Sequence, residues 1–473
     1  MRRRRLRSAP EGAATRRESS EWMMSRILLI GNKPPQFDAT ARVEAAHYRT
    51  WQFLQPLLED GHAVCLCVED AAPSPNGSGP QQLSEPWRER LSYHPIAFNR
   101  AGWISRLQRI HDAFAPDVVV AVNFAPCLYA TRLRTTRPVW MDIYGDYLTI
   151  MQLAAYRRRS NRGLPTSIAF MQQVLQRGDV FSACGAPQAH MTVGELAMAG
   201  RLNWRTTGYE FVRIILPGAP STGVALPSPS SPRKRPALAE AGVQADDFVV
   251  LWCGGYNTWT DVDTLFAALE SVMARDPRVR FVSIGASTYS APETQYQRFE
   301  SMIERSAHRA RYHLLGWRPW GQIAGYYRDS DVGLNVDAMH YETVYGTRTR
   351  LLEMMSAGLP VITTEGCELS YRLRDHGAGL SFAAGDTHAL AGHILSLSRD
   401  PERRDQLARR AIECARADLS FAETTRPVRD WVKSPSLAPD RAASSAQHRI
   451  TQATHHARAA ARQMIWQLTG LDR

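Results

Sequence analysis

Polar residues that can bind an anion follow two short apolar runs in the carboxyl-terminal half of this 473-residue sequence. The runs, at 331–337 and 361–363, have the length of buried strands, and the segment 349–357 between them has helical periodicity and ends at Gly358. In parallel sheets, ligands bind at the carboxyl ends of the strands, where the amino ends of helices attract anions. The polar residues at these predicted ends are Asp337, Glu342, Gly346, Thr347, Arg348, Thr364, Glu365 and Gly366.

Arg348 is the candidate for binding a phosphate group, because its charge and the helix dipole add at the amino end of the predicted helix. Arg350, two residues on, is predicted to point to another face and to be structural. In the amino-terminal half, the strand-like run 138–143 carries Asp142 near its end, where a ligand would also be met. Asp146 follows a glycine and is typical of a turn or a helix cap.

The segment from Gly346 to Ile362, whose helix ends in LLEMMSAGLPVI, resembles the donor-nucleotide motif of the retaining family-4 (group 1) glycosyltransferases of the GT-B fold. The resemblance implies that Glu353 hydrogen-bonds the ribose hydroxyls of a nucleotide-sugar. The family motif has another glutamate eight positions earlier, beside the donor sugar, where this sequence has Tyr345. Glu342, three residues upstream of Tyr345, is then the carboxylate expected to reach the sugar.

Two further segments match the family in outline. In LLGWRPW, the family pattern places Trp317 and Arg318 against the nucleobase. The strand-like run 248–253 ends in Gly254 and Gly255, and in the family the loop that follows carries an arginine and a lysine that neutralise the donor diphosphate. Both are missing from this loop, so the resemblance leaves the diphosphate to Arg348.

These observations give a set of expected site residues. The expected catalytic residues are Asp142, Glu342 and Arg348. The expected substrate-binding residues are Gly254, Gly255, Trp317, Arg318, Tyr345, Gly346, Thr347, Glu353, Glu365 and Gly366. No metal ligand and no cofactor are expected, because no DxD-like pair of carboxylates stands at a strand end and the nucleotide-sugar is itself a substrate. The resemblance implies a retaining transfer in which the donor phosphate helps to activate the acceptor.

The elements that must position these residues are predicted to form an α/β protein with two doubly wound, Rossmann-like domains that face a cleft. The length supports two domains, since 473 residues exceed what one hydrophobic core usually holds. The predicted parts are a disordered basic tail at 1–24, an amino-terminal acceptor domain at 25–216, a Pro- and Ser-rich linker at 217–236, a carboxyl-terminal donor domain at 237–433, and a basic tail with an amphipathic helix at 434–473. Met23 or Met24 is an alternative start.

The net charge of +11 does not indicate nucleic-acid binding, because the excess of basic residues lies in the tails and the linker. We expect at most a weak contact of the basic tails with an anionic membrane surface. The apolar runs are strand-sized, far below the roughly 18 residues of a membrane span, and no apolar signal-peptide core follows MRRRRLR. Seven cysteines without a CxxC spacing favour reduced thiols, so we expect a cytoplasmic protein, at most peripheral to the inner face of the membrane.

The function expected from this combination is transfer of a sugar from a nucleotide-sugar donor to an acceptor. Two other hypotheses remain open. One is a non-catalytic GT-B partner that binds a glycan or stabilises an active enzyme, which the missing glutamate and the missing basic pair favour. The other is a sugar-nucleotide epimerase, which would give product isomers without any acceptor.

Overall fold

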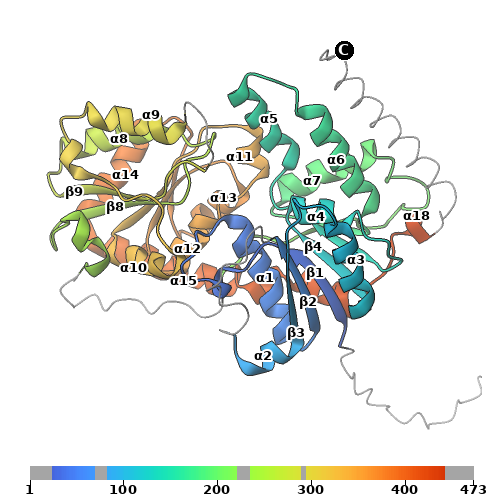
Figure 1. Ribbon diagram of the computed structural model, residues 1–473. Coiled ribbons are helices and arrows are strands. Elements are labelled where there is room, and N and C mark those ends of the chain that lie inside the picture. Colours follow the sequence, from blue (N-terminus) through green and yellow to red (C-terminus); the bar gives the residue numbers. More distant parts are fainter. Residues whose placement is uncertain (1–23, 70–82, 221–234, 289–293, 443–473) are drawn as a thin grey trace, which may run out of the picture.

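The computed structural model describes residues 24–69, 83–220, 235–288 and 294–442. These ranges form two α/β domains that lie side by side, with β1 to β7 in one and β8 to β13 in the other (Figure 1). The predicted disordered tail at the amino end, most of the predicted linker and the predicted amphipathic helix lie outside the described residues, apart from Met24 and the short segments 217–220, 235–236 and 434–442.

Within the described residues, the first sheet has seven parallel strands in the order β3-β2-β1-β4-β5-β6-β7. They are β1 (Arg26–Gly31), β2 (Ala63–Glu69), β3 (Leu91–Ile96), β4 (Val118–Val122), β5 (Val139–Asp142), β6 (Val180–Ala183) and β7 (Val212–Ile214). The helices of this domain are α1 (Ala45–Glu59), α2 (Glu85–Arg90), α3 (Trp103–Phe114), α4 (Phe124–Ala130), α5 (Tyr147–Arg158), α6 (Leu164–Arg177) and α7 (Ala186–Met198). The central strand β4 is buried along its whole length, because helices cover both faces of a parallel sheet.

The second sheet, as far as the described ranges show it, has six parallel strands in the order β10-β9-β8-β11-β12-β13. They are β8 (Phe248–Cys253), β9 (Val279–Ile284), β10 (Tyr312–Leu314), β11 (Val332–Asn335), β12 (Val361–Thr364) and β13 (Leu380–Phe382). The helices are α8 (Val262–Met273), α9 (Gln295–Glu304), α10 (Trp320–Asp329), α11 (Tyr341–Tyr345), α12 (Thr349–Ser356), α13 (Glu368–Asp375), α14 (Thr387–Arg399) and α15 (Pro401–Ala417).

Both sheets share one topology, which confirms the predicted pair of doubly wound domains. In each sheet the strand order reverses at its first strand, between β1 and β4 and between β8 and β11. Ligands of such sheets bind in the crevice outside the carboxyl ends of the strands at this switch point. The ends of β8 and β11 are therefore the place where the fold itself predicts a ligand.

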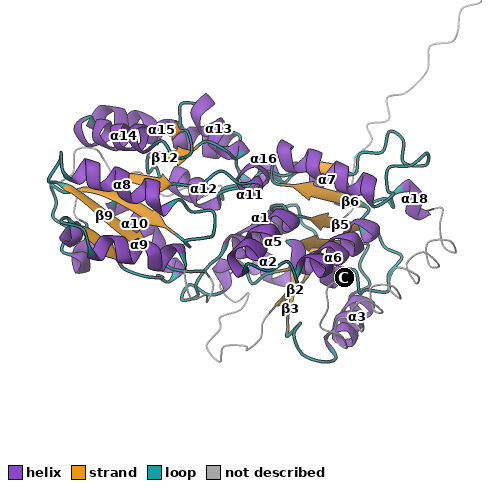
Figure 2. Ribbon diagram, turned by 90° about the horizontal axis from the view of Figure 1, so that it is seen from above, coloured by secondary structure: helices purple, strands orange, loops and turns teal. Residues whose placement is uncertain are grey.

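The last helices, α16 (Phe421–Thr424), α17 (Arg426–Lys433) and α18 (Pro439–Ala442), pack on the amino-terminal domain. Phe421, Val428 and Val432 belong to the same hydrophobic core as β1 and β4. Figure 2 shows α16 at the junction of the two domains. The sequence had placed the end of the carboxyl-terminal domain at residue 433. The chain returns to the amino-terminal domain before that residue, because these apolar side chains complete the core of the amino-terminal domain.

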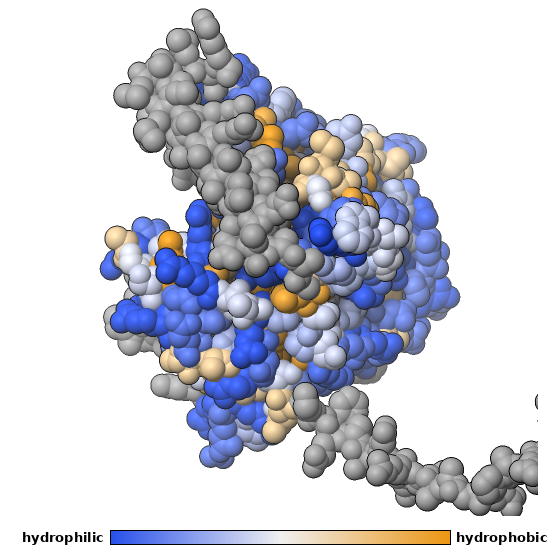
Figure 3. Space-filling model, turned by 90° about the vertical axis from the view of Figure 1, so that its right-hand side faces the viewer, coloured by the Kyte–Doolittle hydropathy of each residue, from blue (hydrophilic) through white to orange (hydrophobic). Residues whose placement is uncertain are grey.

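In the part of the chain that the structure describes, no helix combines the length and the hydropathy needed to cross a membrane. On the face of the amino-terminal domain seen in Figure 3, hydrophilic residues predominate and apolar residues form small groups. Isolated exposed side chains such as Met198 and Trp204 are ordinary for a folded domain.

Candidate functional site

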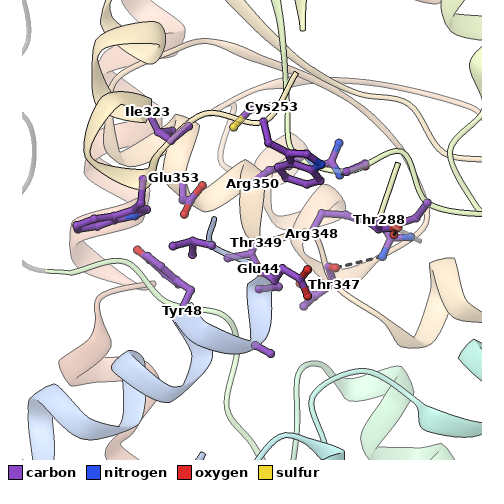
Figure 4. Close-up of a pocket in the computed structure, with 18 of the residues that line it drawn as sticks. Glu44, Tyr48, Cys253, Thr288, Ile323, Thr347, Arg348, Thr349, Arg350 and Glu353 are labelled. Atoms are coloured by element: carbon purple, nitrogen blue, oxygen red, sulfur yellow. Dashed lines mark hydrogen bonds between the residues drawn. The ribbon is translucent and has the colours of Figure 1, made fainter. Parts of the chain in front are cut away.

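A cavity of about 420 Å³ lies between the two domains (Figure 4). The amino-terminal domain contributes the start of α1, together with Asn123 after β4 and Tyr144 after β5. The carboxyl-terminal domain contributes the turn after β8, the start of α10 and the start of α12. The cavity thus lies at the switch point of the second sheet and opens toward the carboxyl ends of strands in the first.

Gly254 and Gly255, predicted to bind substrate, form the turn after β8 and line the cavity. Gly254 has a φ of +99°, a backbone conformation that residues other than glycine rarely adopt. At Gly255, an added Cβ would lie 2.1 Å from Cγ2 of Thr288 and 3.4 Å from the ring of Trp317. The two glycines therefore let the backbone run close to the cavity wall.

Helix α12 brings the largest group of polar residues to the cavity. Its apolar side chains, among them Leu351, Leu352 and Met355, are buried in the core of the domain, so the opposite face is left for the cavity. Arg350 and Glu353 lie on that cavity face, one turn apart, as residues three positions apart do in a helix (Figure 4).

Glu353 is oriented by a hydrogen bond from the hydroxyl of Tyr327, with an O–O distance of 2.7 Å. Burial raises the pKa of Glu353, while this hydrogen bond and the charge of Arg350 act in the opposite direction. Tyr327 is buried, and its hydroxyl holds the one residue that the family resemblance assigns to the ribose.

Arg348 lines the cavity, but two carboxylates neutralise its charge. Its Nε donates to Asp337 at 2.6 Å, and its Nη2 donates to Glu342 at 2.8 Å. Burial acts to lower the pKa of Arg348, yet the two carboxylates outweigh it and raise the pKa above its ordinary value. Glu342 is itself buried and does not line the cavity. The two predicted catalytic residues therefore meet in an ion pair that fixes the loop between α11 and α12.

Arg350 differs from the sequence interpretation, which had placed it on another face as a structural residue. It lines the cavity and donates from Nη2 to the carbonyl oxygen of Gly255 at 2.9 Å. Its guanidinium lies 4.5 Å from the ring centroid of Trp252. Among the described residues, its Nη1 has no hydrogen-bond partner although it is shielded from solvent.

Asp142, predicted to be catalytic, lies outside the cavity lining. Its carboxylate is fully buried and accepts hydrogen bonds from Nε and Nη2 of Arg49, at 3.0 and 2.7 Å, and from the hydroxyl of Ser182. Arg49 belongs to α1, which also forms part of the cavity wall. Because both oxygens of Asp142 have partners, the residue positions α1 and does not reach a ligand.

Four of the predicted substrate-binding residues also lie outside the cavity lining. Tyr345 stacks on Tyr341, and an added Cβ at Gly346 would meet Glu342. Glu365 accepts hydrogen bonds from Arg374 and Ser381, at 3.2 and 2.8 Å, on the other side of the strand end. Gly366 donates its N–H to the hydroxyl of Ser370.

Trp317, Arg318 and Thr347, which were also predicted to bind substrate, line the cavity. The guanidinium of Arg42, from the amino-terminal domain, lies 3.8 Å from the ring centroid of Trp317. Arg318 forms an ion pair with Glu240. The hydroxyl of Thr347 is shielded from solvent and has no partner among the described residues.

The cavity lining contains the carboxylates Glu44 and Glu353 and no histidine. A group that could ligate a metal ion, His376, Cys414 and Asp418, is present at the ends of α13 and α15. None of these three residues lines the cavity. The cavity instead combines a carboxylate that can accept from hydroxyl groups, guanidinium donors for phosphate, and aromatic rings on which a base can stack.

Residues 247–400 match the family model of the group 1 glycosyl transferases. Among solved structures, the chain is similar to sucrose-phosphate synthase from Thermosynechococcus elongatus, with 17% identity and a TM-score of 0.64 over 87% of this chain and 100% of that one. It is also similar to HepE from Anabaena in complex with UDP and glucose, with 16% identity and a TM-score of 0.62 over 87% and 100% of the two chains. The structure of trehalose-6-phosphate from E. coli bound with UDP-2-fluoro glucose has 11% identity and a TM-score of 0.59 over 87% of this chain and 100% of that one. No curated protein sequence matches the chain.

Proposed function

We propose that this chain moves a sugar from a nucleotide-sugar to an acceptor held by the amino-terminal domain. Its residues 247–400 match the group 1 glycosyl transferases, and it has the GT-B fold. The observation that carries the proposal is the position of Glu353. Its carboxylate lines the interdomain cavity and is held by Tyr327, and the family resemblance implies that it binds the ribose hydroxyls. An ionised carboxylate has the acceptor sites for two such hydroxyls.

A UDP-sugar is the donor that we propose first. The HepE structures hold UDP, UDP with glucose, or UDP-glucose, and the E. coli structure holds UDP-2-fluoro glucose. In this chain, Trp317 lines the same cavity as Glu353 and offers an aromatic face to a nucleobase.

We propose that the transfer proceeds with retention and without a metal ion. Negative charge develops on the diphosphate as the sugar leaves, and the amino end of α12, together with Arg350, would stabilise that charge. The family resemblance supports retention, with the donor phosphate helping to activate the acceptor. The start of α1, Asn123 and Tyr144 would then hold the acceptor from the opposite wall.

The test is the thermal stability of the purified protein with UDP-, GDP-, ADP-, CDP- and dTDP-sugars, each with magnesium and with EDTA. A ligand that binds the folded state raises the melting temperature. We expect a rise with a UDP-sugar that EDTA leaves unchanged and that Glu353→Gln removes. Glu304→Gln, an exposed glutamate on α9, is the control and should keep the rise. A rise that survives in Glu353→Gln would refute the assigned site.

A non-catalytic, nucleotide-binding role is the alternative that one observation favours. Neither Tyr345, which stands in place of the family glutamate, nor Glu342 lines the cavity. A chain with this role would show the thermal shift without consuming the UDP-sugar. An epimerase would form an isomer of the UDP-sugar without acceptor. Chromatography of the nucleotide products, with and without candidate sugar acceptors, separates the three outcomes.

The cytoplasm remains the proposed location. All seven cysteines are buried and unpaired, which fits a reducing compartment. The proposed weak contact of the basic tails with an anionic membrane surface is tested by co-sedimentation of the full chain with vesicles that contain phosphatidylserine, at low and at high salt. Binding that disappears at high salt would support it.

A further inference from the structure

We infer that Arg350 is the residue that binds the donor diphosphate, replacing the arginine and the lysine that the family carries in the loop after Gly255. The inference rests on the proposed function and adds to it which residue neutralises the leaving group. The diphosphate would then be bound by the first turn of α12 and not by the turn after β8. Within α12 it would be bound by Arg350, which the sequence analysis predicted to be structural, and not by Arg348.

The first observation is a guanidinium of a cavity-lining residue in which one nitrogen has no partner. Nη1 of Arg350 is shielded from solvent and has no hydrogen-bond partner, and no ion pair to this arginine is formed within the described ranges. The carboxylates of Asp337 and Glu353 act on Arg350 through space, without a direct ion pair. A buried cation that contacts no carboxylate is unfavourable, and a bound anion would stabilise it. The diphosphate of a nucleotide-sugar is an anion that can occupy this position in the cavity.

The second observation is the contrast with Arg348. Asp337 and Glu342 together carry more negative charge than Arg348 can neutralise, so an additional anion would be repelled there. At Arg350, burial lowers the pKa, whereas Arg348 has its pKa raised by its carboxylates against the effect of burial. The positive charge that a ligand can still use therefore lies at Arg350.

The third observation concerns the residues that neighbour Arg350 in the cavity wall. A Cβ added at Gly254 would lie 3.5 Å from its Nη2, so the guanidinium packs against the glycine turn. The hydroxyl of Thr347, shielded and unpartnered within the described residues, is a second donor in the same lining. Glu353 lies one helical turn further on, and side chains three positions apart are neighbours at about 5–6 Å. That spacing suits a ribose and the phosphate attached to it.

A purely structural Arg350 is the competing explanation, since it also bonds to Gly255 and stacks on Trp252. The two explanations predict opposite effects of removing the charge. A structural arginine stabilises the protein in the absence of ligand. A diphosphate-binding arginine whose charge is uncompensated does not, because its removal relieves the unpaired charge.

The experiment compares the wild type with Arg350→Met, Arg350→Lys and the control Arg298→Met, an exposed arginine on α9. Affinities for UDP and for uridine are measured by calorimetry, and melting temperatures are measured without ligand and with pyrophosphate. We expect Arg350→Met to weaken the affinity for UDP about 10- to 100-fold, the usual effect of losing a charge-assisted hydrogen bond. The affinity for uridine should stay within about twofold of that of the wild type. Its melting temperature without ligand should equal or exceed that of the wild type, and the shift with pyrophosphate should vanish. Arg350→Lys should recover part of the affinity for UDP.

Two results would overturn the inference. If Arg350→Met binds UDP as the wild type does, or loses UDP and uridine in equal proportion, Arg350 has a structural role and the proposed function stands without it. If the wild type binds none of UDP, GDP and ADP, the proposed function fails and the inference fails with it. The binding by the wild type thus separates the two failures.

Discussion

Arg49, Arg348 and Arg350 all lie near the cavity, and their partners differ. Arg49 is paired with Asp142, and Arg348 with both Asp337 and Glu342. Arg350 forms no ion pair among the described residues. An arginine whose donors are occupied by buried carboxylates holds elements together, whereas one with unused donors at a cavity can bind a ligand.

The pair of Arg49 and Asp142 gives a prediction for stability. Asp142→Ala leaves the guanidinium of Arg49 buried without a counter-charge, so we expect the free energy of unfolding to fall by about 3–5 kcal/mol in urea titrations. The free energy of unfolding should fall less in the double variant Arg49→Met with Asp142→Ala than in Asp142→Ala alone. Equal losses in the single and the double variant would show that the pair does not act as described.

Glu195 on α7 gives a prediction for pH. Both oxygens of its carboxylate are shielded from solvent, and burial followed by the neighbouring Asp146 raises the pKa from 4.5 to about 8. The folded state then binds this proton more tightly than the unfolded chain, so the stabilisation is complete below pH 4.5 and is lost as the pH rises to about 8. We expect the melting temperature to fall over this window, and Glu195→Gln to reduce the fall. A variant with the same pH profile as the wild type would exclude Glu195 as the cause.

At the residue scale, Glu353, Trp317 and the two glycines after β8 could be singled out from the sequence, because each follows a strand or lies in a recognisable motif, and all four line the cavity. It could not predict the partner of Asp142, since Arg49 is 93 positions away in the chain. Arg350 was within reach of the sequence. It precedes Glu353 by three positions, and residues with this spacing share a helix face.

At the scale of elements, the runs of apolar residues predicted the central strands, because strands of a parallel sheet are buried on both faces. The edge strand β3 was not predicted, since it contains Pro95, which interrupts a strand pattern and is tolerated only at an edge. Helix α11 was not predicted either. It has only five residues, too few to show a helical period, and its place is fixed by the ion pair of Glu342 with Arg348.

The turn after β8, which lies against the residue that follows β9, gives a prediction at this scale. A Cβ at Gly285 would lie 1.9 Å from the carbonyl oxygen of Gly254, so the ends of the two strands must separate to admit it. We expect Gly285→Ala to lower the free energy of unfolding by about 1–3 kcal/mol, as overpacking does, and to weaken UDP binding.

Gly392→Ala is the matched control, because this glycine lies within α14 and has open space around it. Alanine there should raise the stability by about 0.5–1 kcal/mol, since glycine is unfavourable inside a helix. The same effect on stability at both positions would contradict the packing described for the turn.

At the scale of the whole molecule, the two domains are joined by the returning carboxyl-terminal helices and by contacts beside the cavity. Arg429 on α17 pairs with Asp60 at the end of α1. Beside the cavity, the hydroxyls of Tyr144 and Thr349 are 2.7 Å apart across the domain boundary. The cavity is therefore built from both domains, and its shape depends on their relative position.

Phe421 tests this arrangement. The side chain is buried in the core that contains β1 and β4, although it lies far later in the chain than either strand. We expect Phe421→Ala to lower the free energy of unfolding by about 3–5 kcal/mol and to speed amide hydrogen exchange in the strands of the amino-terminal domain. Tyr371→Ala, on the surface of α13, should change neither. Faster exchange confined to β8 to β13 would contradict the packing of the last helices.

The most direct test of the central claim, that the cavity is a nucleotide-sugar site centred on Glu353, is calorimetric titration of UDP into the wild type and into Glu353→Gln. We predict binding to the wild type in EDTA, and an affinity at least about tenfold lower in Glu353→Gln, because the amide accepts less strongly from the ribose hydroxyls. The control Glu304→Gln should bind as the wild type does. Equal affinity in the wild type and in Glu353→Gln would contradict the account.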